Sequence, residues 1–163
     1  MDFERLRQLW IPAIASGFAR PEDWIGWADR MILKLDEPPV WVIEMGTASS
    51  IASVLKELAS NGAAHDRATY PPYEETWQAT VFLGFVAESY LRGDLQTETL
   101  AKITYSLLEM YGWPWPDWLS EHELAVSTGS RLPNPASHRI SEEYGLQIHA
   151  SRAAWSELLA AAA

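Results

Sequence analysis

One group of histidine and acidic residues near the end of the chain has the spacing of metal ligands. His138, Glu142 and His149 would return to nearly one face if they lay on a single helix. A histidine and a glutamate on one face can bind zinc. However, Gly145 lies between them and no fourth ligand is indicated. We therefore expect no bound metal, and an ordinary surface pair between His138 and Glu142.

Glu88 is an acid in an otherwise apolar helical stripe, between Val81 and Leu91. Burial raises the pKa of a carboxyl group, as catalysis by a general acid requires. Buried ion pairs are nevertheless commoner than catalytic sites. We therefore expect the Glu88 carboxylate to reach solvent or an arginine, such as Arg30 or Arg92.

The segment from Tyr111 to Glu123 combines tryptophan with acidic residues, and its candidate interface residues are Trp113, Trp115, Asp117, Trp118, Glu121 and Glu123. Pro114 and Pro116 separate the first tryptophans. Between residues 68 and 130 there are nine acidic residues and two basic ones. Tryptophan rings anchor protein interfaces and acids steer basic partners, so the segment could bind a basic protein surface. The alternative is that the three tryptophans fill the core. Stacking on a sugar is a further use of tryptophan, which an all-α setting does not favour.

The elements that must position these residues are helices, because proline and glycine separate segments of helical periodicity. The predicted helices cover about 2–15, 20–35, 50–60, 73–92, 95–111, 117–126, and one or two segments from 137 to the end. Residues 40–45 could form a strand or a helical turn, since Val-Trp-Val-Ile is β-prone. Residues 127–135 are expected to form an exposed loop, and residues 160–163 a frayed tail.

The predicted helix over 73–92 should lie at the centre of the fold, because residues 79–87 are apolar on nearly every side. Phe85 should be buried there. Only Gly93 and Asp94 separate this helix from the one over 95–111, so the two should pack antiparallel, with Asp94 as the N-cap. The sequence therefore predicts an all-α, multi-helix bundle that forms one domain over residues 1–163.

The composition excludes several function classes. The chain has 163 residues, 48% of them hydrophobic, and a formal net charge of −10. An acidic surface repels phosphates, so nucleic-acid binding is not expected. The absence of cysteine excludes disulfides, thiolate metal sites and cysteine nucleophiles. No apolar stretch approaches the length of a membrane span. We expect a cytoplasmic protein that needs no cofactor.

In size, charge and helix content the chain resembles the small acidic bacterial immunity and antitoxin-type proteins that cap a basic toxin. This resemblance is one of class, without shared motifs, and assigns no residue roles. It implies a non-enzymatic binding protein that neutralises a basic protein partner. Two alternatives remain open. One is a small helical enzyme or metal-dependent hydrolase that uses Glu88 or the His138–Glu142–His149 group. The other is a structural or assembly subunit, such as a homodimer.

Overall fold

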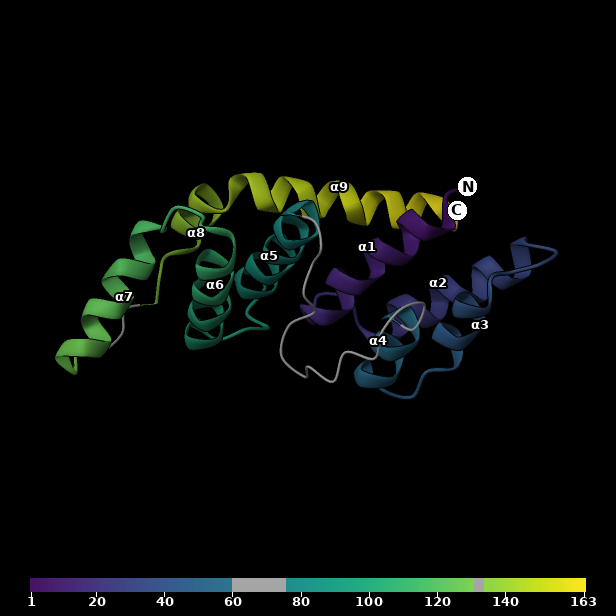
Figure 1. Cartoon of the computed structure of the whole chain (residues 1–163), viewed down its shortest axis with the longest axis horizontal. Helices are drawn as coiled ribbons and strands as arrows, with labels where there is room; N and C mark the ends of the chain where they lie inside the picture. Colours follow the sequence, from purple (N-terminus) through teal and green to yellow (C-terminus); the bar gives the residue numbers. More distant parts are fainter. Residues whose placement is uncertain (60–75, 131–133) are drawn as a thin grey trace.

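A computed structural model describes residues 1–59, 76–130 and 134–163 (Figure 1). Its helices are α1 (Phe3–Ala15), α2 (Pro21–Lys34), α3 (Val40–Thr47), α4 (Ile51–Ala59), α5 (Thr76–Leu91), α6 (Thr97–Tyr111), α7 (Asp117–Thr128), α8 (Ser137–Glu143) and α9 (Gly145–Ala161). The described residues contain no strand, so the predicted all-α fold is confirmed. Within those ranges no helix is both long enough and apolar enough to cross a bilayer.

Residues 40–45 belong to a helix, so the strand alternative is wrong. Val42 and Met45, three residues apart on α3, are both fully buried. The Trp41 ring stacks on Trp27 of α2, with 5.9 Å between the ring centroids. Burial of one helical face against α2 thus outweighs the β-propensity of this segment.

A first hydrophobic core lies among α1–α4, one side of α5 and the second half of α9. Its largest fully buried side chains include Trp10, Trp24 and Trp27. The rings of Trp10 and Trp27 meet edge to face at 5.4 Å. The indole N–H of Trp27 donates a hydrogen bond of 2.7 Å to the carbonyl oxygen of Leu158. The end of α9 is therefore built into the core formed by the first helices.

A second core lies among α5, α6, α7, α8 and the start of α9, and α5 contributes to both cores. Phe82 and Val86 face the second core, whereas Val81 and Phe85 face the first. Phe85 is fully buried, and its ring lies 4.7 Å from that of Phe18. The predicted central position of this helix is confirmed. Residues 73–75 of the prediction lie outside the described residues.

α5 and α9 approach each other closely at Gly84. A Cβ atom on Gly84 would lie 1.9 Å from the carbonyl oxygen of Gln147 and 2.8 Å from Oγ of Ser151. No side chain fits there, so the glycine permits the two backbones to approach. α9 passes along one side of the molecule and links the two cores (Figure 1).

The connection from α5 to α6 returns the chain so that α6 packs against α5, as predicted. Asp94 is not the N-cap of α6, because Gln96 occupies that position. The Asp94 carboxylate instead forms ion pairs with Arg92 at 3.0 Å and with Arg20 at 3.5 Å. It therefore joins the end of α5 to the start of α2.

Two predicted irregular segments are more helical than expected. Ser127 and Thr128 form the last turn of α7, which ends at Gly129 in the left-handed conformation with φ of +64°. Residues 131–133 lie outside the described residues. The segment 160–163, expected to fray, begins as the last turn of α9, and Ala162 is buried in the first core. The Lys34 ammonium also donates hydrogen bonds to two backbone carbonyls of this segment.

Candidate functional site

The three tryptophans of the predicted interface have different surroundings, and Trp118 belongs to the core. Its side chain is 2% exposed. Its indole N–H donates a hydrogen bond of 3.1 Å to the hydroxyl of Tyr144, which lies 2.9 Å from Oγ1 of Thr104. Burial raises the pKa of the Tyr144 hydroxyl above its ordinary value. Trp118 cannot contact a partner in this conformation.

The variant Tyr144→Phe tests this buried network. It removes the oxygen that Trp118 and Thr104 share, so the indole N–H is left buried without an acceptor. We expect a loss of about 1–3 kcal/mol in the free energy of unfolding, measured by thermal or urea denaturation. The control Tyr105→Phe removes a hydroxyl from a side chain that is 37% exposed and should melt like the parent. Equal melting of all three proteins would contradict a structural role for the network.

Trp113 and Trp115 lie nearer the surface. The Trp113 ring is half-buried and stacks on Tyr111, with 5.2 Å between centroids. Trp115 is 45% exposed, and its ring meets Tyr105 of α6 edge to face at 5.4 Å. Of the three tryptophans, Trp115 is therefore the one best placed to meet a partner.

The acidic residues of the predicted interface also differ in whether they form ion pairs. Glu121 is bound by Arg139 of α8 through two hydrogen bonds, of 2.7 and 3.0 Å, and the same guanidinium donates to Glu143. These hydrogen bonds lower the pKa of the Glu121 carboxyl. Asp117 and Glu123 are exposed and form no ion pair with any described residue. Only the latter two acids of the segment are free to meet a basic surface.

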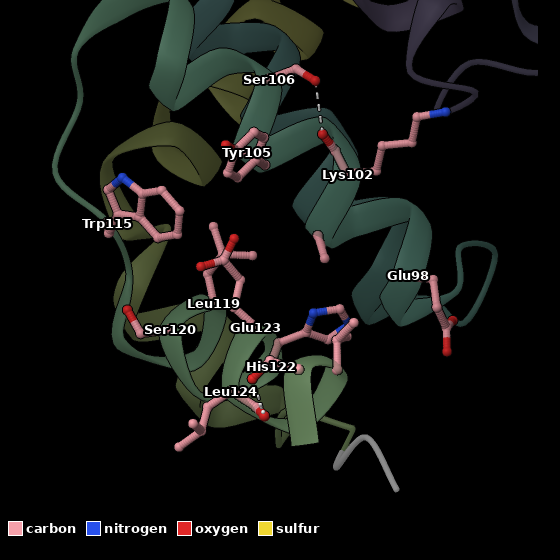
Figure 2. A pocket seen from close by; sticks show the side chains of 13 residues that line it. Glu98, Lys102, Tyr105, Ser106, Trp115, Leu119, Ser120, His122, Glu123 and Leu124 are labelled. Atoms are coloured by element: carbon pink, nitrogen blue, oxygen red, sulfur yellow. Dashed lines mark hydrogen bonds between the residues drawn. The ribbon is translucent and has the colours of Figure 1, made fainter. Parts of the chain in front are cut away.

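A groove lies between α6 and α7, with a volume of about 1010 Å³. We call it the α6–α7 groove. Figure 2 shows Trp115 and Tyr105 close together at one side of this hollow and Glu98 at the other. Leu124 and Val126 of α7, which also line it, are 65% and 59% exposed. Three of these groove residues, Tyr105, Leu124 and Val126, were not singled out from the sequence.

Glu88 is an ion-paired residue. Its carboxylate accepts a hydrogen bond from the guanidinium of Arg152 on α9. The expectation of an arginine partner is confirmed, but neither Arg30 nor Arg92 is that partner. The carboxylate is 12% exposed and the arginine 69%, so this pair lies at the edge of the α5–α9 contact. Because the Glu88 carboxylate is paired with Arg152, the structure does not support Glu88 as a general acid.

The proposed metal-binding face is not formed, because its residues lie on two helices. His138 and Glu142 are on α8, whereas His149 is on α9, beyond the break at Tyr144. Of the one or two helices expected from residue 137 to the end, two form. In the part of the chain that the structure describes, no three His, Asp or Glu side chains gather as metal ligands would.

Comparison with known proteins found no family model, no curated protein and no solved structure that matches the chain. Its function must therefore be inferred from its own residues.

Proposed function

We propose that this chain is a non-enzymatic binding protein whose acidic, tryptophan-bearing surface over α6 and α7 meets a basic protein partner in the cytoplasm. Neutralisation of that partner, in the manner of an immunity or antitoxin-type protein, is the role that we favour. The observation that carries the proposal is the exposure of Trp115 beside the α6–α7 groove, close in sequence to acids without an ion-pair partner among the described residues.

The charge of this surface supports a basic partner. Four exposed acids of α6 and α7 form no ion pair with any residue that the structure describes: Glu98, Glu109, Asp117 and Glu123. Lys102 is the single lysine or arginine between residues 97 and 128. Such a field attracts basic surfaces and raises the rate of association, whereas it repels phosphates and a second acidic copy.

The proposal predicts that charge near the groove sets the association rate. The partner is first captured from the cells of origin and purified, and association rates are then measured at increasing salt. The test variant neutralises three exposed acids of α6 and α7: Glu109→Gln, Asp117→Asn and Glu123→Gln. We expect its association rate at low salt to fall roughly tenfold, with the dissociation rate nearly unchanged. Glu121 is kept, because its substitution would also release Arg139.

The matched control makes the same change of charge at three exposed acids of α2 and the α2–α3 connection: Glu22→Gln, Asp36→Asn and Glu37→Gln. None of these positions belongs to α6 or α7, and the α2–α3 connection lies at the end of the molecule opposite α7 (Figure 1). Their variant should associate at close to the parental rate. Equal slowing by both variants would assign the effect to net charge alone. An association rate that does not respond to salt would refute the proposed function.

A further inference from the structure

The geometry points to a helix as the element of the partner that the α6–α7 groove receives. We propose that one amphipathic helix, apolar on one face and rich in lysine or arginine beside it, lies between α6 and α7. This inference rests on the proposed function, because it assigns the chemistry of the partner at the same surface.

One wall of the groove is α7, and the apolar side chains in its second half are exposed. Within α7 only Trp118 and Leu119 are buried, and both lie in its first turn. Leu124 and Val126, further along α7, are 65% and 59% exposed and line the groove. Exposed apolar side chains are the groups that a partner commonly covers. Leu124 and Val126 are two residues apart and lie on different sides of α7, and both leave apolar surface exposed at the groove.

The aromatic end of the groove provides an anchor point. Trp115 and Tyr105 hold each other edge to face, so their rings are oriented before a partner arrives. Pro114 and Pro116 flank Trp115 and restrict its backbone. Large aromatic side chains with few rotatable bonds dominate the energy of many interfaces. An apolar side chain from the partner would fit against these two rings.

The charges of the groove favour a basic helix over a second copy of this chain. Glu98 and Glu123 line the groove on α6 and α7, and Lys102 is the one lysine or arginine among the lining residues. Lysines and arginines beside the apolar face of a partner helix would meet the two glutamates. A second copy would instead bring its own α7, with Asp117 and Glu123, and a net charge of −10. Like charges placed together oppose that arrangement.

The two walls also suit a helix in shape. α6 and α7 consist of 15 and 12 residues, so each presents rows of side chains between which a third helix can place its own. The groove is open, and its volume of about 1010 Å³ is at the upper end of what small molecules fill. Docking of an amphipathic helix in an apolar groove is a common form of peptide recognition.

The experiment uses the full chain and three synthetic peptides of about 18 residues, made of leucine and lysine or leucine and glutamate. The first peptide has leucines on one helical face and lysines elsewhere. The second has the same composition with the leucines scattered, and the third has glutamate in place of lysine. Dissociation constants are measured by calorimetry. We expect the first peptide to bind at least about tenfold more tightly than the other two.

Two groove variants and one matched control locate the binding. Trp115→Ala and, independently, Leu124→Ala should weaken binding of the first peptide about tenfold or more, while melting close to the parent because both side chains are exposed. The control Leu33→Ala removes a leucine of α2 that is 88% exposed and should change the dissociation constant less than about twofold. Amide chemical shifts should change over residues 98–127.

Three results would overturn the helix proposal: no binding up to roughly 100 μM, equal binding of the scattered peptide, or shift changes centred on α2 and α3. Its failure can be distinguished from failure of the proposed function. Suppose that neutralising the acids of α6 and α7 slows association of the purified partner, while the three peptides bind with similar dissociation constants. The binding function then stands and the helix is rejected. If the first peptide binds in the groove but the association rate of the partner depends on neither salt nor these acids, the proposed function fails.

Discussion

Gly84→Ala is expected to lower the free energy of unfolding by about 3 kcal/mol or more, at the upper end of what overpacking usually costs. The added methyl group would lie 1.9 Å from the carbonyl oxygen of Gln147, which belongs to the backbone of α9 and cannot rotate away. Relief requires α5 and α9 to separate, and these two helices link both cores. The melting temperature should fall by roughly 6–12 °C, since 1 kcal/mol corresponds to about 2–4 °C in a chain of this length.

The matched control is Gly26→Ala on α2, also inside a helix. There the nearest atom to an added Cβ is the end of the Arg30 side chain, at an ordinary 3.7 Å. Alanine is the better helix former by about 1 kcal/mol, so this variant should melt at or above the parental temperature. If both substitutions stabilise the protein, α5 and α9 do not approach as closely as the structure has them.

Phe85→Ala is expected to cost about 3–5 kcal/mol, since it removes a fully buried ring and leaves a cavity. The ring packs against Phe18, from the connection between α1 and α2, and against Trp155 of α9. None of these neighbours can fill the space without disturbing a helix contact. Urea denaturation of the variant should show a lower midpoint with a similar slope.

A substitution of an exposed apolar residue provides the comparison for Phe85→Ala. Leu33→Ala on α2 changes a side chain that is 88% exposed, and its effect should stay within about 0.5 kcal/mol. If Phe85→Ala and Leu33→Ala have the same stability, α5 is not the shared helix of the two cores.

Helical periodicity and glycine or proline boundaries were enough to predict most of the helices. α2 begins at Pro21 as expected, and α6 ends at Gly112 in the left-handed conformation. Periodicity does not decide the state of α3, because Val42 and Met45 are too few to define a helical stripe and residues 40–43 are β-branched or aromatic. Its helical state depends on the packing of Trp41 against Trp27, which are distant in sequence. Local propensity does not contain that contact.

The main contact of α5 was also missed, since periodicity shows that a helix is buried but not which helix buries it. The sequence does hold one signal. Gly84 lies inside an apolar helix, where alanine would be about 1 kcal/mol better, and such a glycine indicates close packing. The partner, α9, could not be identified from this signal.

The candidate site was predicted in part. Trp115 lies between two prolines, which keep its backbone out of a regular helix, and its side chain is 45% exposed. Trp118 is three residues further on and has the same residue type, yet it is buried because α7 turns it towards Tyr144. The ion pair of Glu121 with Arg139 joins residues 18 apart, across the connection between α7 and α8. The composition of the segment therefore does not show which tryptophan is buried or which acid is ion-paired.

The position of α9 also has a consequence for the order of events during synthesis. Trp27 donates its indole N–H to the carbonyl of Leu158, and Leu158 itself is fully buried in the core of α1–α4. That core therefore has an open side while the ribosome is still translating the segment before α9. Domains usually fold from the N-terminus as they emerge. Here the first helices keep part of their apolar surface exposed until α9 has been synthesised and has packed against them.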